Sequence, residues 1–479
     1  MKRGLLMFAL LFGAIGILSG CGSIDDQYDV VVIGGGASGM SAAIEADAGG
    51  AKVALIEADA ILGGNSRFAF EGMNAAQSAI QSEAGVSDSV ADYNADISSA
   101  ADGMNNQNLS GQVAEDSAAA LDWVNENGAN FTSLIQLPGS SAARTHTTPT
   151  NDSAGLSLVS ALESSMKNTD INVLRETQVL SITLVSVSNN LNRIEIRSAN
   201  NTTKTITAKA LILANQDLAD MTNITNLTDP ELLSQASFYE DTPDSLSTSL
   251  RMIKELNLDV YHYGQRDIFD TFSPDANENV PVTLRTFGAF MVNSSGKRFV
   301  NELAPRDEVA AAILNQPSQN GYLIFNEKLL DTVSLNSALL HSGYIYSAAN
   351  IDDLAKRLDM EPATLRQTLK TYNEAVANKS DSEFGRDMNM NADRLISLEQ
   401  GPYYAIKVHP VSYIRSTGVK VANISQPTIG GQIVDGLFIA GDFPGGVYGN
   451  QQLYGDDLTQ SVVFGRHAAQ AALRYVNGE

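Results

Sequence analysis

The sequence has very little cysteine and histidine. Cys21 is the one cysteine among 479 residues, and the five histidines never fall at the spacings of a metal site. A single cysteine excludes a disulfide within the chain, a cysteine-ligated iron–sulfur cluster and a haem attached through a C-x-x-C-H motif. The sequence therefore predicts no metal site, and any redox chemistry requires an organic cofactor.

The chain is also poor in basic residues. Its 31 Lys and Arg face 55 Asp and Glu, which gives a formal net charge of -24. Such a surplus repels nucleic acid and anionic lipid headgroups, so nucleic-acid binding is excluded. We interpret the acidic surplus as a solvated surface, and the docking of a basic redox partner is the alternative. The hydrophobic content of 43% is enough for a large globular core.

Long apolar runs are absent except near the N-terminus. Lys2 and Arg3 precede an apolar core at residues 5–18, a pattern typical of an export signal. No later stretch approaches the roughly 18 apolar residues that would span a bilayer. The mature protein is therefore expected not to cross a membrane.

The end of this apolar core carries a processing motif. Residues 18–21 read Leu-Ser-Gly-Cys and resemble the lipobox of bacterial lipoproteins, in which cleavage before the cysteine leaves it to be acylated. We predict a lipoprotein signal peptide at 1–20, lipidation of Cys21 and a linker at 21–28. The protein is then exported and held by its lipid anchor alone, at the periplasmic face or the cell surface. An ordinary signal peptide with an incidental cysteine is the alternative.

A buried strand, a glycine-rich turn and a helix open the mature chain. Residues 29–33 read Asp-Val-Val-Val-Ile, as expected for a strand covered on both faces. In the G-x-G-x-x-G motif that follows, Gly34 permits the tight turn, Gly36 lets the backbone approach a pyrophosphate and Gly39 lets the helix pack closely. The second strand ends at Glu57, where a carboxylate can accept hydrogen bonds from ribose hydroxyls. The pattern predicts a dinucleotide-binding fold.

The stretch after the second strand indicates which dinucleotide binds. Residues 61–66 read Ile-Leu-Gly-Gly-Asn-Ser, and residues 72–76 read Gly-Met-Asn-Ala-Ala. They resemble the "IGGN...GGMNAA" stretch of the fumarate reductase flavoprotein family, of the soluble flavocytochrome c and urocanate reductase type without a haem domain. The resemblance covers most of the mature chain and implies non-covalent FAD. The predicted FAD-binding residues of this half are Gly34, Gly36, Ala37, Ser38, Gly39, Glu57, Gly63, Gly64, Asn65, Gly72, Met73 and Asn74.

A second cofactor-binding segment lies near the C-terminus. Residues 436–442 read Gly-Leu-Phe-Ile-Ala-Gly-Asp and, with the glycines of residues 445–449, resemble the family's closing "GLYAAGE...GGVHG" motif. Gly441 and Asp442 are the predicted FAD contacts, with Asp442 in place of the family's Glu. Leu458 is expected to begin a helix whose N-terminus faces the isoalloxazine carbonyls.

These segments predict an α/β fold with a discontinuous, Rossmann-like FAD-binding domain and an inserted α+β capping domain. The FAD-binding parts are residues 29–265 and 413–479, and the cap is residues 266–412. Within the cap, residues 296–302 read Gly-Lys-Arg-Phe-Val-Asn-Glu and resemble a motif of the family's capping domain. Such a lid closes over the flavin and excludes water.

The resemblance also implies a catalytic mechanism. In the family, a hydride passes from flavin N5 to one alkene carbon, and an arginine shortly after "GKRFVNE" protonates the other. Arg306 stands at that position. A guanidinium is a poor acid, so this role requires a desolvated site and a reprotonation relay. Arg285 matches the arginine of the family's relay, whereas the relay glutamate falls on Val282.

The positions that hold a dicarboxylate in the family differ in this chain. The family's "HPT" histidine falls near Asp267, its "HHTMGG" histidines near Tyr413 and Ile414, and its "GANRLGG" arginine on Gln452. Without basic groups to clamp a carboxylate, tight binding of fumarate is not expected. We predict that Asp267, Tyr413, Gln452 and Tyr454 bind a less charged unsaturated molecule with an aromatic, hydroxyl or amide group.

Three functions stay open at this level. The first is an FAD-dependent reductase or dehydrogenase of an activated carbon–carbon double bond, supplied by a separate electron-carrier protein because the one dinucleotide fingerprint is taken by FAD. The second is a flavin oxidase or dehydrogenase of another substrate. The third is a non-catalytic FAD-binding surface lipoprotein. Val282 favours the third, as do Asn215 and Gln216, which replace the family's "ATGG" turn.

Overall fold

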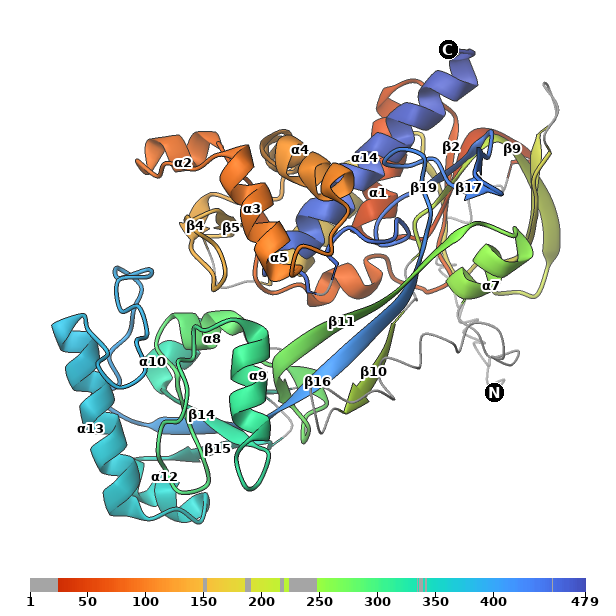
Figure 1. Cartoon of the computed structure of the whole chain (residues 1–479). Helices are drawn as coiled ribbons and strands as arrows, with labels where there is room; N and C mark the ends of the chain where they lie inside the picture. The colour runs from red at the N-terminus through yellow and green to blue at the C-terminus, as the bar shows by residue number, and fades with distance from the viewer. Residues whose placement is uncertain are drawn as a thin grey trace, which may run out of the picture.

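The computed structural model describes residues 25–149, 153–185, 191–215, 219–223, 248–333, 335, 339–340, 343–449 and 451–479. The predicted signal peptide, Cys21 and Gln216 lie outside these residues. The described chain forms a nucleotide-binding unit around a mostly parallel sheet and a second unit, the cap (Figure 1). Every helix in the described segments is too short or too polar to cross a bilayer.

A seven-stranded sheet forms the centre of the nucleotide-binding unit. Its strands are β1 (Gln27–Ile33), β2 (Val53–Ile56), β6 (Asn172–Leu174), β7 (Gln178–Thr183), β8 (Asn192–Arg197), β9 (Thr203–Leu213) and β19 (Leu437–Ile439). The order is β6-β2-β1-β9-β8-β7, with β19 beside the C-terminal end of β9. β8 runs antiparallel to both of its neighbours, β7 and β9, and all other pairs of neighbouring strands are parallel. Because β19 comes from the C-terminal segment, the unit is discontinuous in sequence.

Helices cover this sheet on both faces. The helices of the whole unit are α1 (Ala37–Ala48), the 3-10 helix η1 (Gly64–Phe68), α2 (Ala79–Glu83), α3 (Val90–Ala100), α4 (Gln107–Glu126), α5 (Ala154–Met166), α7 (Thr248–Glu255) and α14 (Asp456–Asn477). Val30 and Val32 of β1 pack in the core that contains α1, α4 and α14, and Val31 and Ile33 pack in the core that contains α7. The apolar run of β1 follows from this position, since a strand covered on both faces has no polar side.

Two small sheets complete the nucleotide-binding unit. Their strands are β3 (Met73–Asn74), β4 (Ser133–Ile135) and β5 (Thr145–Thr147) in one, and β17 (Thr428–Ile429) and β18 (Gln432–Ile433) in the other. In the first of these sheets β5 is the central strand and pairs with both β3 and β4. This pairing positions the predicted flavin-binding turn, which contains β3.

Two long antiparallel strands connect the nucleotide-binding unit to the cap. These strands, β11 (Val260–Ser273) and β16 (Tyr403–Val419), run diagonally between the two units in Figure 1, and β10 (Ala219–Asn223) pairs with β16. We call β11 and β16 the stem. The predicted domain boundaries, at 265/266 and 412/413, fall inside the stem and nearly opposite each other in its register.

The cap packs helices against the far part of the stem. Its other elements are β12 (Glu278–Asn279), α8 (Val282–Thr286), β13 (Phe290–Val292), α9 (Arg306–Leu314), β14 (Gly321–Asn326), α10 (Glu327–Leu330), β15 (Ile345–Ala348), α12 (Ile351–Arg357) and α13 (Pro362–Asn378). β14 and β15 both pair with β16, and β13 pairs with β14. The cap thus has its own apolar core, which includes Leu323, Phe325 and Tyr372.

A buried cluster of charged side chains links the motif at residues 296–302 to α8. Arg298 contacts both carboxylate oxygens of Glu302 at 2.9 Å and one oxygen of Asp381 at 2.9 Å. Arg386 lies 3.3 Å from Glu302 and donates a hydrogen bond to the backbone carbonyl of Arg285. Burial alone would raise the pKa of Glu302, but the two arginines outweigh it and the pKa is lowered. The cluster therefore holds the segment that carries Arg285.

Replacing Glu302 with alanine is expected to lower the free energy of unfolding by about 3–5 kcal/mol, because two buried arginines lose the carboxylate that they share. The melting temperature of the FAD-loaded protein measures the effect. Since the folded pKa of Glu302 is lowered, the wild type keeps this stabilisation above the unfolded pKa and loses it as the pH falls through the folded value. Glu374, in an exposed pair with Lys370, is the matched control and should tolerate alanine. Equal melting temperatures for the two variants would contradict the prediction.

Candidate active site

The glycine motif forms a tight turn between β1 and α1. Gly34 has a φ of +107°, a conformation that residues with a side chain rarely adopt. A Cβ on Gly39 would lie 1.8 Å from the Gly34 carbonyl oxygen, so only glycine lets α1 start this close to the strand. α1 begins at Ala37 after Gly36, which has no side chain to cap the helix. Gly36 thus leaves the first turn of α1 without a side-chain cap of its own, as at helix N-termini that bind anions.

Three neighbouring segments hold this turn in place. The Glu57 carboxylate accepts a hydrogen bond from the Gly35 N–H at 2.8 Å. The Gly63 N–H donates to the Gly35 carbonyl at 2.8 Å, and the Ser66 hydroxyl accepts from the Ala37 N–H at 3.1 Å. The segment that starts η1, with the exposed residues 64 and 65, therefore lies beside the glycine turn.

The C-terminal segment reaches the same place. A Cβ on Gly441 would lie 3.3 Å from the Ser38 side chain, and Gln460 of α14 donates to the Gly441 carbonyl at 2.8 Å and to Asp442 at 3.1 Å. Leu458 is buried in the core near the start of α14. The Ser38 hydroxyl is buried and has no hydrogen-bond partner in the described chain. A buried hydroxyl at the N-terminus of α1 fits a phosphate-bearing cofactor.

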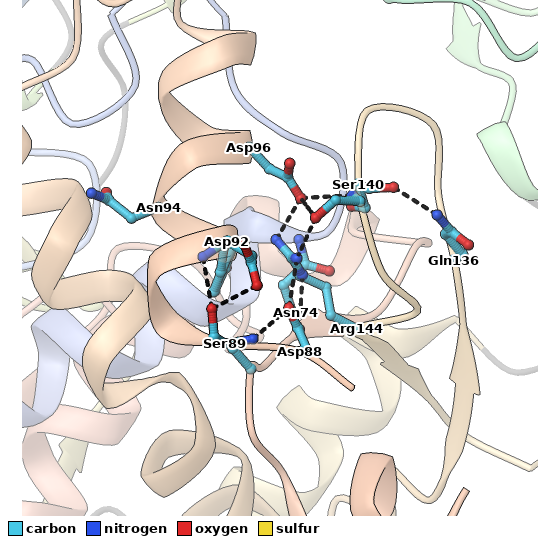
Figure 2. Close-up of polar contacts among 12 residues, drawn as sticks. Asn74, Asp88, Ser89, Asp92, Asn94, Asp96, Gln136, Ser140 and Arg144 are labelled. Carbon is cyan, nitrogen blue, oxygen red and sulfur yellow. Dashed lines mark hydrogen bonds and ion pairs between the residues drawn. The ribbon is translucent and has the colours of Figure 1, made fainter. Parts of the chain in front are cut away.

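A buried arginine supports the predicted flavin turn at Gly72–Asn74. Arg144 directly precedes β5, the strand that pairs with β3. Figure 2 shows its guanidinium between Asp88 and Asp96, with nitrogen–oxygen distances of 2.8 Å to each carboxylate. Arg144 is fully buried, so these ion pairs fix β5 and, through it, the turn.

The Asn74 side chain joins this turn to the start of α14. Its Nδ2 donates to Asp456 at 2.7 Å and to the Tyr454 carbonyl at 2.7 Å, and its Oδ1 accepts from Thr145 at 2.6 Å. α14 begins at Asp456, two residues before the predicted start. Burial raises the pKa of Asp456 to about 7 against the hydrogen bonds from Tyr93 and Asn74. Asn74 therefore fixes the backbone that presents Tyr454.

Both predicted catalytic arginines contact Tyr454. The guanidinium carbon of Arg306 lies 3.5 Å from the centre of the Tyr454 ring, and Arg285 donates from Nη2 to the Tyr454 oxygen at 2.5 Å. The Tyr454 hydroxyl donates to Asp270 at 3.1 Å, and Arg285 forms a 2.5 Å ion pair with the other oxygen of Asp270. All except Arg306 are buried.

The surroundings of Arg285 and Tyr454 determine which of these two side chains carries a charge. Burial alone would lower the pKa of Arg285, but Asp270 and Tyr454 outweigh it and the pKa is raised, so Arg285 is charged. Burial raises the pKa of Tyr454, so the phenol is neutral. Arg285 and Asp270 therefore form a charged pair that holds a neutral hydroxyl.

Glu71 adds a second carboxyl group beside the arginines. It occupies the first glycine position of the family's "GGMNAA" motif and is only 9% exposed. Burial raises its pKa, and the charges of Arg306 and Arg285 act in the opposite direction. Two guanidinium groups thus share the site with two carboxyl groups, and with both carboxyls ionised the formal charges cancel.

A cavity of about 300 Å³ opens beside Arg306 and Tyr454. Its described lining residues are Ser99, Ala100, Asp102, Pro138, Gly139, Pro305, Arg306, Asp307, Glu308, Gln451, Gln452, Leu453 and Tyr454. Arg306 is the one basic residue among them, and three are acidic. The volume suits a small organic molecule.

Two of the four predicted substrate-binding residues line the cavity. Tyr454 and the buried Gln452 line the cavity with Arg306. Asp267 and Tyr413 are register partners on the stem, but their side chains lie outside those the structure describes. Val282 starts α8 and is buried. Among the residues that the structure describes, no group of three or more His, Cys, Asp or Glu side chains is placed to hold a metal ion.

Sequence reasoning missed Asp270, Glu71 and Ser66. Asp270 lies inside the otherwise mostly apolar run at residues 268–272, and an unexplained aspartate in a buried strand was the signal that could have found it. Glu71 could have been found as a departure from the family motif. Ser66 could not, because its contact with α1 depends on the tertiary fold.

This fold and site define an FAD-binding flavoprotein. The family model described as "FAD binding domain" matches residues 29–458. The chain belongs to this family, in its fumarate reductase branch. It is an FAD-dependent oxidoreductase acting on CH–CH bonds.

Named relatives place the chain more closely. It is 30% identical over 451 residues to the probable fumarate reductase Ifc3 of Shewanella frigidimarina, covering 94% of this chain and 75% of that protein. It is 24% identical over 497 residues to the vinyl phenol reductase of Lactiplantibacillus plantarum, covering 93% and 97%. A flavocytochrome c3 fumarate reductase in its open conformation superposes with a TM-score of 0.69 at 28% identity, covering 95% of this chain and 79% of that one.

Proposed function

We propose that the protein reduces an activated carbon–carbon double bond in a small uncharged molecule rather than in fumarate. The observation that supports this most strongly is the charge balance of the site. Asp270 neutralises Arg285 in a 2.5 Å ion pair, and the carboxyl group of Glu71, whose pKa burial raises against the charge of Arg306, lies beside the arginines. A dianion would enter a site in which Arg285 is already paired and in which a second carboxyl group lies beside the arginines.

The cavity supports the same conclusion. Besides Arg306, its described lining offers the amides of Gln451 and Gln452, the Tyr454 ring and apolar surface from Pro138 and Leu453. Amides can bind a carbonyl or hydroxyl but cannot neutralise a carboxylate. The vinyl phenol reductase among the relatives is named for an uncharged alkene.

The reaction divides between cofactor and protein. FAD, when bound by the glycine turn and the segment at Gly441, supplies a hydride. Arg306 lies where the substrate cavity meets the cap, and we assign it the proton delivered to the second alkene carbon. Closure of the cap over this region would exclude water, which favours proton transfer from a weak acid.

A substrate panel tests the proposal. The purified, FAD-loaded protein, reduced anaerobically by a viologen dye, is mixed with acrylamide, 4-vinylphenol, acrylate or fumarate, and dye oxidation is followed. We expect a kcat/KM for at least one neutral alkene about 100-fold above that for fumarate. Gln452→Arg should shift the preference toward the two carboxylates by about tenfold or more, because a charged hydrogen bond adds roughly 1.5–3 kcal/mol.

The matched control adds the same charge elsewhere. Gln367→Arg lies on the exposed face of α13 and should leave the preference unchanged. A kcat/KM of the wild type that is higher for fumarate than for every neutral alkene would contradict the proposal. A flavin oxidase that uses oxygen instead would appear as substrate-dependent oxygen consumption. Bound FAD with no turnover of any compound would favour a non-catalytic role.

The electron source and location are also proposals. Two of the relatives are named cytochrome-type fumarate reductases. We infer that a separate electron-carrier protein serves this chain, and the acidic surplus suits a basic one. Export and lipid attachment at Cys21 stay predictions of the N-terminal sequence, which mass spectrometry of the mature N-terminus can check.

A further inference from the structure

Tyr454 occupies an unusual place for a substrate-binding residue. Its hydroxyl is not directed to the cavity, because it accepts a hydrogen bond from Arg285 and donates one to Asp270. Its ring face lies against the Arg306 guanidinium at 3.5 Å. The position is a glycine in the family's "GANRLGG" motif, so the phenol is an addition of this chain.

The loss of the relay glutamate leaves a chemical problem that this arrangement can solve. After Arg306 gives its proton to the substrate, its guanidine is neutral and must regain a proton before the next turnover. Residue 282, where the family has its glutamate, is a buried valine and cannot supply one. The carboxylate that pairs with Arg285 comes from Asp270 on β11, whereas the family's glutamate would lie at residue 282 on α8.

We propose that the Tyr454 hydroxyl reprotonates Arg306, with Arg285 as the positioning residue for the phenol and Asp270 as the carboxyl group that passes the next proton to it. This inference rests on the proposed function. The proton of the Tyr454 O–H passes to the neutral guanidine of Arg306, directly or across one water at the edge of the ring. The resulting phenolate keeps its hydrogen bond from Arg285 and takes a proton that enters from water through the Asp270 carboxyl.

The step balances and has a driving force. Each turnover moves one proton from water to Asp270, to Tyr454, to Arg306 and to the substrate carbon, and the two electrons come from the hydride. In water a phenol is a stronger acid than a guanidinium, with pKa values of about 10 and above 12, but burial raises the pKa of Tyr454 and removes part of this difference. The transfer also places the phenolate between two guanidinium groups, which stabilise its charge.

The test separates the first turnover from later ones. Arg306 is protonated in the resting enzyme, so Tyr454→Phe should leave the first turnover intact and slow those that follow. The FAD-loaded protein is reduced with dithionite and mixed with one equivalent of the best neutral alkene of the panel, and flavin reoxidation is followed by absorbance. We expect a rate within about threefold of the wild type in this single turnover, and a steady-state rate about 100-fold lower.

Further measurements distinguish the relay from a structural effect. The solvent isotope effect on the steady state should rise in Tyr454→Phe, because reprotonation becomes limiting. Asp270→Asn should show the same pattern, and Asp270→Glu should recover part of the rate. Tyr403→Phe, which removes another buried hydroxyl from the cap, is the control and should match the wild type in both phases.

The outcomes are distinct. An unchanged steady state in Tyr454→Phe, or an equal fall in both phases, would overturn the relay while the proposed function stands. A wild type that no alkene reoxidises would overturn the proposed function and the relay with it.

Discussion

Replacing Arg306 with glutamine is expected to lower the steady-state turnover of the preferred alkene by about 10³-fold while FAD stays bound. General acid catalysis by a positioned group contributes roughly 10²–10⁴-fold, and an amide cannot donate its proton in this way. In contrast to Tyr454→Phe, the loss should be equally large in the first turnover. Dye-coupled kinetics and stopped-flow absorbance measure the two phases.

Arg394 provides the control for this variant. It also lies over an aromatic ring of the cap, Phe287, at 5.8 Å, but it does not line the cavity. Arg394→Gln should therefore keep turnover within about threefold of the wild type. If Arg306→Gln behaves in the same way, Arg306 is not the acid.

Replacing Gly39 with valine is expected to abolish FAD binding. Even the Cβ of alanine would lie 1.8 Å from the Gly34 carbonyl oxygen, and backbone cannot rotate away as a flexible side chain could. α1 must then shift off β1, which moves the amides and Ser38 away from the pyrophosphate position. The FAD content of the purified protein, read from flavin absorbance, should fall below one tenth of the wild-type content.

Gly111 is the matched control for Gly39. It lies in α4, and outside the backbone of that helix no neighbouring atom comes within 4 Å of the position that a Cβ would take. Gly111→Ala should therefore keep FAD and gain up to about 1 kcal/mol of stability. A Gly39→Val protein with full FAD content would show that the close contact is not needed.

Much of the fold could be predicted from local sequence. The apolar run of β1, the glycine spacing and Glu57 each reflect a local constraint, and the C-terminal ends of β1 and β2 lie within one residue of their predicted positions. The start of α14 was placed two residues late, because Asp456 has no capping role that a sequence pattern reveals and is held by Asn74 and Tyr93.

The site was less predictable because its charges are assembled from distant segments. Arg306 and Arg285 could be assigned through motifs, but their partners Asp270 and Tyr454 are separated by 184 residues in sequence. The departure at Val282 suggested a lost relay. In the structure, the carboxylate that pairs with Arg285 belongs to Asp270 of β11. Only the packing of the stem against α8 brings the two side chains together.

The stem couples the position of the cap to the assembly of the proposed proton relay. Arg306, Arg285 and Asp270 belong to the cap and its stem, whereas Tyr454 and Glu71 belong to the nucleotide-binding unit. An opening of the cap by a hinge in the stem would draw Tyr454 away from the two arginines. In the mechanism proposed above, electrons would then be loaded with the acid incomplete, and the proton relay would be complete only once the substrate is enclosed.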